Sequence, residues 1–299
     1  MAGSELAREE SDSRRIDHLT LAIVAESESA PQNDISQLKI LSLPNKGISS
    51  CDDLSQLKSL QRIDLPSNEL TEADFLQYNL ELCWIDLRMN QIHQLSFLKY
   101  LRALTVLNLS HNQISKIDNL SGLMNLKALI LSHNQIRNIP DLSFLTNLET
   151  LVVSHNQVEE IIRPQKTMKQ LKKISLSNNQ IRNFPFGEKF PELAELRLNS
   201  NKLMTLPSNK IQQMSMLRIL DIGNNAINDI KIFSSLQNLL KLRNINIAGN
   251  LSAEDMAIVF SQFSTHKTLE IFNSKNIKDV PPSRKRKRNV PSVTVLKKH

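Results

Sequence analysis

Apolar and polar positions along this chain follow one pattern, Leu-x-x-Leu-x-Leu-x-x-Asn-x-Ile, which is clearest between Leu104 and Ile114. Copies that keep the asparagine are separated by 22 to 25 residues. These asparagines are Asn68, Asn90, Asn112, Asn134, Asn156, Asn179, Asn201, Asn225 and Asn250. A further, imperfect copy from Leu38 to Ile48 has Lys46 at that position. A fixed period of this kind predicts a solenoid, because no single unit can cover its own apolar face and neighbouring units must stack.

Each copy predicts one strand followed by a tight return segment. In the strand, Leu107 and Leu109 should point inward while the residues between them point outward. Ten parallel strands about 4.8 Å apart would form a concave sheet roughly 45–50 Å long. The asparagine amide is expected to turn inward and satisfy backbone groups of its own and the adjacent copy. The return residues Ile114, Ile117 and Leu120 recur every third position, which favours 3₁₀ turns over an α-helix.

The pattern therefore predicts an α/β leucine-rich repeat solenoid with helical caps, since an open end would expose the core. A cap helix is expected after Ser13, with apolar residues on one face at Ile16, Leu19, Ile23 and Val24. At the other end, residues 252–264 begin with a Ser-x-x-Asp capping signature and predict a helix, which residues 269–272 follow as a short last strand. The longer last repeats have room for α-helical turns. The predicted divisions are a cap at 1–34, repeats at 35–250, a second cap at 251–280 and a basic tail at 281–299.

Composition narrows the function classes. Aromatic residues make up only 4% of the chain, so leucine and isoleucine must build the core. The six glycines include no phosphate-binding motif, and the two cysteines, Cys51 and Cys83, have no metal-ligand spacing. The N-terminus is charged where a secretory signal needs an apolar run, and no apolar stretch is long enough to span a membrane. We expect a soluble protein of a reducing intracellular compartment, without cofactor or metal.

Positive charge is concentrated at the C-terminal end. The chain has 37 basic and 30 acidic residues, and the seven cations of residues 281–299 account for the whole excess. Five of these cations are consecutive, namely Arg284, Lys285, Arg286, Lys287 and Arg288. A proline-flanked basic run predicts a nuclear localisation signal read by an import receptor, and hence a nuclear protein with room for a cytoplasmic pool. A weak nucleic-acid contact and a merely solubilising tail are the alternatives.

The 22-residue unit, with Ile-x-x-Ile-x-x-Leu-x-x-Leu after its asparagine, resembles the intracellular leucine-rich repeat class typified by protein phosphatase-1 regulatory subunit 7. More loosely, the chain is similar to the spliceosomal snRNP A-prime protein and the acidic nuclear phosphoproteins. The resemblance covers roughly residues 35–250 and implies a binding protein without catalytic chemistry. The acidic tail of the phosphoproteins is missing here. A basic-Val-x-Phe phosphatase-docking motif is missing too, because Val290 is followed by Pro291 and Ser292.

The repeat frame also identifies side chains that should point out of the concave sheet. Trp84, the single tryptophan, is among them, and the frame extends an apolar stripe from it. Exposed apolar patches rimmed by charge mark protein interfaces. The candidate partner-binding residues, with the charged ones as the rim, are therefore Arg62, Asp64, Trp84, Asp86, Arg88, Met89, Val106, Ile130 and Val152. The alternatives are that Trp84 folds over its neighbours or over the Arg88 stem, and that the charges form an ordinary solvated network.

Three histidines, His111, His133 and His155, occupy one repeat position and predict a ladder with about 5 Å between neighbours. Such a ladder suits a metal or a pH-sensitive cluster, but it also arises from simple copying of the Ser-His-Asn-Gln unit. No Ser-His-Asp arrangement and no paired carboxylates in an evident pocket can be defended. We therefore expect no enzymatic activity.

The predicted function is a non-catalytic scaffold or adaptor that binds another protein through its concave face, away from membranes. A phosphatase regulatory subunit, an RNA-associated spliceosomal or ribosome-assembly component, and a cytoskeletal or centrosomal adaptor are the competing classes. The phosphatase relative has acidic and large aromatic residues across its middle repeats. The middle column here reads Asn108, Ile130, Val152 and Ser175, and nucleic-acid binding is expected only through the tail.

Overall fold

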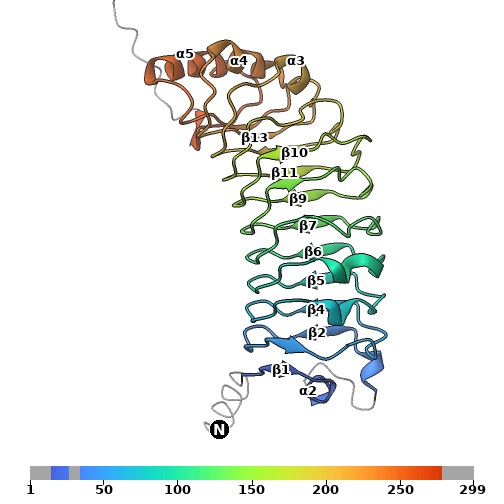
Figure 1. Ribbon diagram of the computed structural model, residues 1–299. Coiled ribbons are helices and arrows are strands. Elements are labelled where there is room, and N and C mark those ends of the chain that lie inside the picture. Colours follow the sequence, from blue (N-terminus) through green and yellow to red (C-terminus); the bar gives the residue numbers. More distant parts are fainter. Residues whose placement is uncertain (1–14, 27–33, 278–299) are drawn as a thin grey trace, which may run out of the picture.

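The computed structural model describes residues 15–26 and 34–277. Its main sheet has 12 strands stacked in chain order along one axis, all parallel except the last pair (Figure 1). These strands are β2 (Ile40–Ser42), β4 (Arg62–Asp64), β5 (Trp84–Asp86), β6 (Val106–Asn108), β7 (Ala128–Ile130), β9 (Thr150–Val152), β11 (Lys173–Ser175), β12 (Glu195–Arg197), β13 (Ile219–Asp221), β14 (Asn244–Asn246), β15 (Ile271–Phe272) and β16 (Lys275–Asn276). Each predicted repeat supplies one strand, from β2 to β14.

The pairing register brings equivalent repeat positions side by side. Trp84 pairs with Arg62 on one side and with Val106 on the other. The central residue of each strand points into the core, and Ile85 and Leu107 are fully buried. The flanking residues point out of the sheet, as the alternation of a strand requires. The predicted leucine-rich repeat solenoid is therefore confirmed.

The repeated asparagine links each repeat to the one before it. Asn112 Nδ2 donates to the carbonyl oxygen of Leu87 in the preceding repeat (2.9 Å) and to that of Leu109 in its own repeat (3.1 Å). Asn112 Oδ1 accepts a hydrogen bond from the backbone N–H of Ile92 (2.9 Å). The other asparagines of the pattern make the same kinds of contact, including the last one, Asn250. The predicted role of the asparagine is confirmed.

The convex side consists of short elements. The 3₁₀ helices are η1 (Ile35–Gln37), η2 (Asp74–Leu76), η3 (Ser96–Tyr100) and η4 (Leu236–Asn238), and the α-helices are α3 (Ser208–Ile211) and α4 (Ile230–Ser235). The α-helical turns predicted in the last repeats are confirmed. The predicted 3₁₀ turns form at η1, η2 and η3, but not over residues 114–120, where the prediction was wrong and the return segment is irregular. In the middle, β8 (Asn138–Ile139) and β10 (Glu160–Ile161) pair in parallel instead. Two-residue strands are too short to leave an alternation in the sequence.

The N-terminal cap differs from the predicted helix. A strand, β1 (His18–Leu19), pairs in parallel with β3 (Ser50–Cys51), and the helix α2 runs only over Leu21–Glu26. The hydroxyl of Thr20 accepts a hydrogen bond from the N–H of Ile23 (3.3 Å), so the helix begins after Thr20 rather than after Ser13. Leu19 is buried as predicted, but it enters the core from a strand because the open edge of β3 binds this segment.

The C-terminal cap contains the two predicted elements, a helix and a short last strand. Helix α5 (Ala253–Phe263) begins where the side chain of Ser252 accepts a hydrogen bond from the N–H of Asp255 (3.1 Å). The buried ring of Phe263 lies 5.8 Å from that of Phe272 in β15, measured between centroids. The helix and the short last strand therefore cover the open end of the core, at the top of Figure 1.

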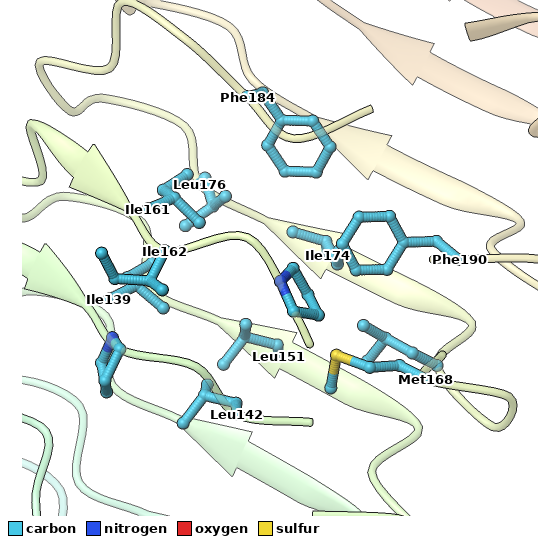
Figure 2. Close-up of a pocket in the computed structure, with 13 residues that line it drawn as sticks. Ile139, Leu142, Leu151, Ile161, Ile162, Met168, Ile174, Leu176, Phe184 and Phe190 are labelled. Carbon is cyan, nitrogen blue, oxygen red and sulfur yellow. The ribbon is translucent and has the colours of Figure 1, made fainter. Parts of the chain in front are cut away.

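A small apolar pocket, partly open to solvent, lies beside the core at the fifth to seventh repeats (Figure 2). Pro164 stands there at the position that Leu120 and Leu142 occupy in earlier repeats. Pro164 lines this pocket together with Phe184 and Phe190 of the next repeat. Every residue around this pocket is apolar. It therefore offers no group for catalysis.

Candidate functional site

Trp84 lies in β5 and is half-buried on the concave side. Its indole Nε1 donates a hydrogen bond to Asp64 Oδ1 (3.0 Å), and the guanidinium carbon of Arg62 lies 4.6 Å from the indole ring centroid. Both partners come from β4, the neighbouring strand. The outward position predicted for Trp84 is correct. The alternative that it packs on its neighbours is also partly correct, although the covering side chain is Arg62 and not Arg88.

Asp64 and Asp86 do not form an exposed rim. They are only 9% and 7% exposed. Arg62 Nε lies 2.6 Å from Asp64 Oδ2, and Arg88 Nε lies 3.6 Å from Asp86 Oδ2. Burial raises the pKa of Asp86, against the lowering effect of the backbone N–H and the guanidinium of Arg88. The rim prediction is therefore wrong for the two carboxylates, because they face the indole and guanidinium groups that bind them.

The predicted apolar stripe crosses two columns of the sheet. Val106 follows Trp84 in one column, while Ile130 and Val152 are neighbours in the next column. All three are half-buried, as a surface stripe requires. The structure adds Ile40, an exposed residue of β2 that pairs with Arg62. The frame of the first repeat identifies Ile40 as outward-facing, but our prediction began at the second repeat and missed it.

Met89 lies beyond the sheet, on the loop that follows β5, and is exposed. Its φ angle is 57°, and the equivalent residues His111, His133 and His155 have nearly the same left-handed conformation. The strand ends at Asp86, and this turn carries Met89 to the edge of the concave face. Met89 therefore lies just after the strand, as the repeat frame indicated, and its part in partner binding stays a prediction.

The three histidines form the predicted ladder on that edge. Their ring centroids are 4.0 Å and 4.2 Å apart, with planes 10° and 9° from parallel. Partial burial, together with repulsion from His111 and His155, lowers the pKa of His133. Among the described residues, no group of three or more His, Cys, Asp or Glu side chains is arranged to hold a metal ion. Nearly parallel rings do not direct their nitrogens at one point.

The C-terminal half of the concave face carries charges that pair with one another. Glu195 Oε1 lies 3.1 Å from Lys173 Nζ and 2.7 Å from Arg197 Nε. Asp221 accepts a hydrogen bond from Asn246 Nδ2 (2.8 Å), and burial raises the pKa of Asp221. Both halves therefore carry charge pairs, and the N-terminal half adds a tryptophan and an apolar stripe.

The structure also brings together a Ser–His–Asp chain that the sequence did not predict. His18 Nδ1 lies 2.6 Å from Ser50 Oγ, and His18 Nε2 lies 3.0 Å from Asp52 Oδ1. His18 lies in β1, Ser50 lies in β3, and Asp52 follows β3. The parallel pairing of β1 with β3 brings the three side chains together. The backbone N–H groups of Ser50 and Asp52 already donate to carbonyl groups of the cap, so neither is available to stabilise an oxyanion. The two hydrogen bonds of His18 therefore attach β1 of the N-terminal cap to Ser50 and Asp52.

The basic run from Arg284 to Arg288 lies outside the described residues. Of the helices that the structure describes, none is long and apolar enough to cross a membrane.

Two family models match the central part of the chain. The model described as "Leucine rich repeat" matches residues 81–136, and "Leucine Rich repeats (2 copies)" matches residues 125–164. The matched residues include Trp84, the stripe to Val152 and the histidine ladder. A search of the curated proteins finds no match. The strand stacking and these matches identify the fold as a leucine-rich repeat solenoid.

Several different solved proteins and complexes contain a chain of similar fold. An internalin from Listeria monocytogenes has a TM-score of 0.50 and 19% identity, covering 84% of this chain and 85% of that chain. A chain of the octameric complex of latrophilin 3, Unc5D and the leucine-rich repeats of FLRT2 has a TM-score of 0.58 and 21% identity, covering 82% and 86%. A chain of the LRIM1/APL1C complex has a TM-score of 0.59 and 17% identity, covering 87% and 54%. At these identities the likeness shows the fold, which commonly mediates protein–protein interaction.

Proposed function

We propose that this protein is a non-catalytic scaffold or adaptor that binds another protein through the N-terminal half of its concave face. The observation that carries the proposal is Trp84, a half-buried tryptophan held by Asp64 and Arg62 beside an apolar stripe. Tryptophan and arginine are typical anchors of interfaces, and a side chain held in place before binding loses little entropy on binding.

The chemistry of this surface narrows the partner. The indole N–H is already donated to Asp64, so Trp84 offers a partner only ring surface. Val106 and Ile130 extend that apolar area, and the nearby charges are already paired. We therefore expect the partner to insert an apolar or aromatic side chain, with an affinity that depends weakly on salt.

We further propose that residues 284–288 direct the protein to the nucleus. The support is the run of five consecutive cations next to Pro281-Pro282. Replacing all five cations by alanine in the full chain should abolish nuclear accumulation of a fluorescent fusion. Unchanged accumulation would leave the run as a solubilising segment.

The test of the binding function is affinity purification from nuclear extract with three proteins. These are the wild type, a Trp84→Ala/Ile130→Asp variant, and a chain lacking residues 281–299. A partner of the concave face should be retained by the wild type and by the truncated chain and lost by the double variant. A matched control, Met204→Ala, removes an exposed apolar side chain elsewhere and should retain the partner.

The identity of what is captured distinguishes the functions. A stoichiometric phosphatase catalytic subunit would favour a phosphatase regulatory subunit. RNA that leaves with the tail and with rising salt would favour an RNA-associated component. If every partner survives the change at Trp84 and Ile130 and leaves with the tail, the concave face is not the binding site. Thermal unfolding of each variant shows whether a loss of binding reflects a loss of folding.

A further inference from the structure

A second exposed apolar area lies on the flank where the return segments turn into the next strands. Its four large side chains come from three successive repeats. They are Tyr78, Leu80, Tyr100 and Met124, which are 55%, 54%, 42% and 59% exposed, and we call them the flank patch. Single exposed apolar residues are ordinary on a protein surface, but a contiguous group needs an explanation.

The repeat period places the side chains of the flank patch at neighbouring positions in successive repeats. Tyr78 and Tyr100 occupy equivalent positions, and their rings lie nearly parallel, 13° apart, with centroids separated by 6.3 Å. Leu80 and Met124 also occupy equivalent positions, with Arg102 at the corresponding place in the repeat between them. The next repeat has Gly122 at the tyrosine position, so the row of rings ends at Tyr100.

Two of the three turns that carry the patch are held by an asparagine of the next repeat. Asn125 Nδ2 donates to the carbonyl oxygen of Arg102 (3.0 Å), and Asn147 Nδ2 donates to that of Met124 (2.9 Å). A surface whose backbone is already fixed loses less entropy when it binds. The backbone below the flank patch is therefore already ordered before a partner binds.

Positive charge surrounds the patch. Lys58 and Arg102 occupy the repeat position of Leu80 and are exposed, and Lys99 Nζ lies 5.2 Å from the centroid of the Tyr100 ring. Among the turn residues 56–59, 78–81, 99–102 and 122–125, Glu81 is the single anion. An acidic partner is therefore favoured over a basic one.

We propose that the flank patch is a second protein-binding surface, which takes an acidic segment with apolar or aromatic side chains. Tyrosine, methionine and arginine are the residues enriched at protein interfaces, and the patch combines them. Single-stranded RNA would also use tyrosines and cations, but Leu80 and Met124 provide neither stacking rings nor charge for it. With this surface beside the concave face, the chain can hold two partners at once.

The test measures binding of a labelled synthetic peptide, in which leucine and phenylalanine alternate with glutamate, to the full chain by fluorescence anisotropy. A Tyr78→Ala/Met124→Ala variant should bind about tenfold more weakly or worse. Arg102→Glu should weaken binding too, and added salt should weaken binding to the wild type. The matched control is Leu240→Ala, because Leu240 occupies the position of Leu80 and Met124 near the far end and is 75% exposed. It should leave the affinity unchanged.

Several outcomes would overturn the proposal. They are no binding of the peptide, equal binding by the Tyr78→Ala/Met124→Ala variant, equal binding of a peptide with lysine for glutamate, and preferred binding of an oligouridine. Ile130→Asp separates this surface from the concave face, because it should leave the peptide affinity unchanged. Loss of binding in Ile130→Asp alone would place the peptide on the concave face and refute the flank patch. All substituted side chains are at least partly exposed, and circular dichroism checks that each variant folds.

Discussion

At the scale of single residues, the second outward position of several strands holds an aspartate or asparagine that caps the backbone two residues later. Asp86 Oδ1 accepts a hydrogen bond from the N–H of Arg88 (3.2 Å), and Asn108 Oδ1 accepts one from the N–H of Ser110 (3.1 Å). The amide and the carboxylate make the same contact. Only the carboxylate has to keep a charge in a buried place, which raises the pKa of Asp86.

Asp86→Asn should therefore raise the free energy of unfolding at pH 7, by up to about 1 kcal/mol. A carboxyl whose pKa is raised by folding binds its proton more readily in the folded state. Its contribution to the free energy of unfolding therefore falls as pH rises through the range in which the carboxyl group loses its proton. Urea denaturation should show the gain at pH 7 and little difference near pH 3, where the carboxyl is protonated in both states. A loss of stability at pH 7 would mean that pairing with Arg88 outweighs the burial of the charge.

At the scale of elements, the asparagine ladder gives each turn a defined energetic role. Asn112→Ala should cost about 3 kcal/mol, because it leaves the buried N–H of Ile92 without its partner and removes three donations to carbonyl groups. Asn250→Ala should cost less, since Asn250 is only partly buried. Urea denaturation of both variants measures the difference. Equal losses would show that exposure of the turn does not affect the contribution of the asparagine.

The histidine ladder makes a second prediction at this scale. Part of the lowering of the His133 pKa comes from repulsion by His111 and His155. Replacing both neighbours by glutamine should therefore raise the pKa of His133 toward its ordinary value, as followed by NMR titration. In the wild type, the contribution of a histidine whose pKa is lowered by folding is fully present above the unfolded-state pKa, about 6.5, and is lost as pH falls from there through the lower, folded-state pKa. An unchanged His133 pKa in the double variant would assign the lowering to burial alone.

At the scale of the whole molecule, each repeat touches only its neighbours, so the ends determine how the solenoid unfolds. Phe263→Ala in α5 should cost about 3–5 kcal/mol, because it empties a fully buried position against Phe272. Hydrogen exchange should increase in the C-terminal repeats and stay unchanged around β5 and β6. Uniform loss of protection along the chain would show that the solenoid unfolds as one cooperative unit.

The sequence predicted the repeated elements well because each inward position is set by a rule that repeats ten times. Leu107, Asn112 and Phe263 are buried in the places that their spacing indicated. Leu19 was also predicted to be buried, but its element was wrong. A short apolar run fits a strand or a helix, and pairing with β3 decided between them.

The candidate site was predicted only in part. The frame identified Trp84 as outward-facing, since alternation along a strand is a local property. The burial of Asp64 and Asp86, the stacking of Arg62 on Trp84, and the pairing of Tyr78 with Tyr100 depend on rotamers and on neighbours 20 or more residues away.

The sequence by itself thus determined the fold, the inward positions and the order of the strands, because a periodic apolar pattern has one way to bury itself. Only the tertiary structure decided which outward side chains remain exposed, because contacts between adjacent repeats cover Asp64 with Trp84 and leave the flank patch open to solvent.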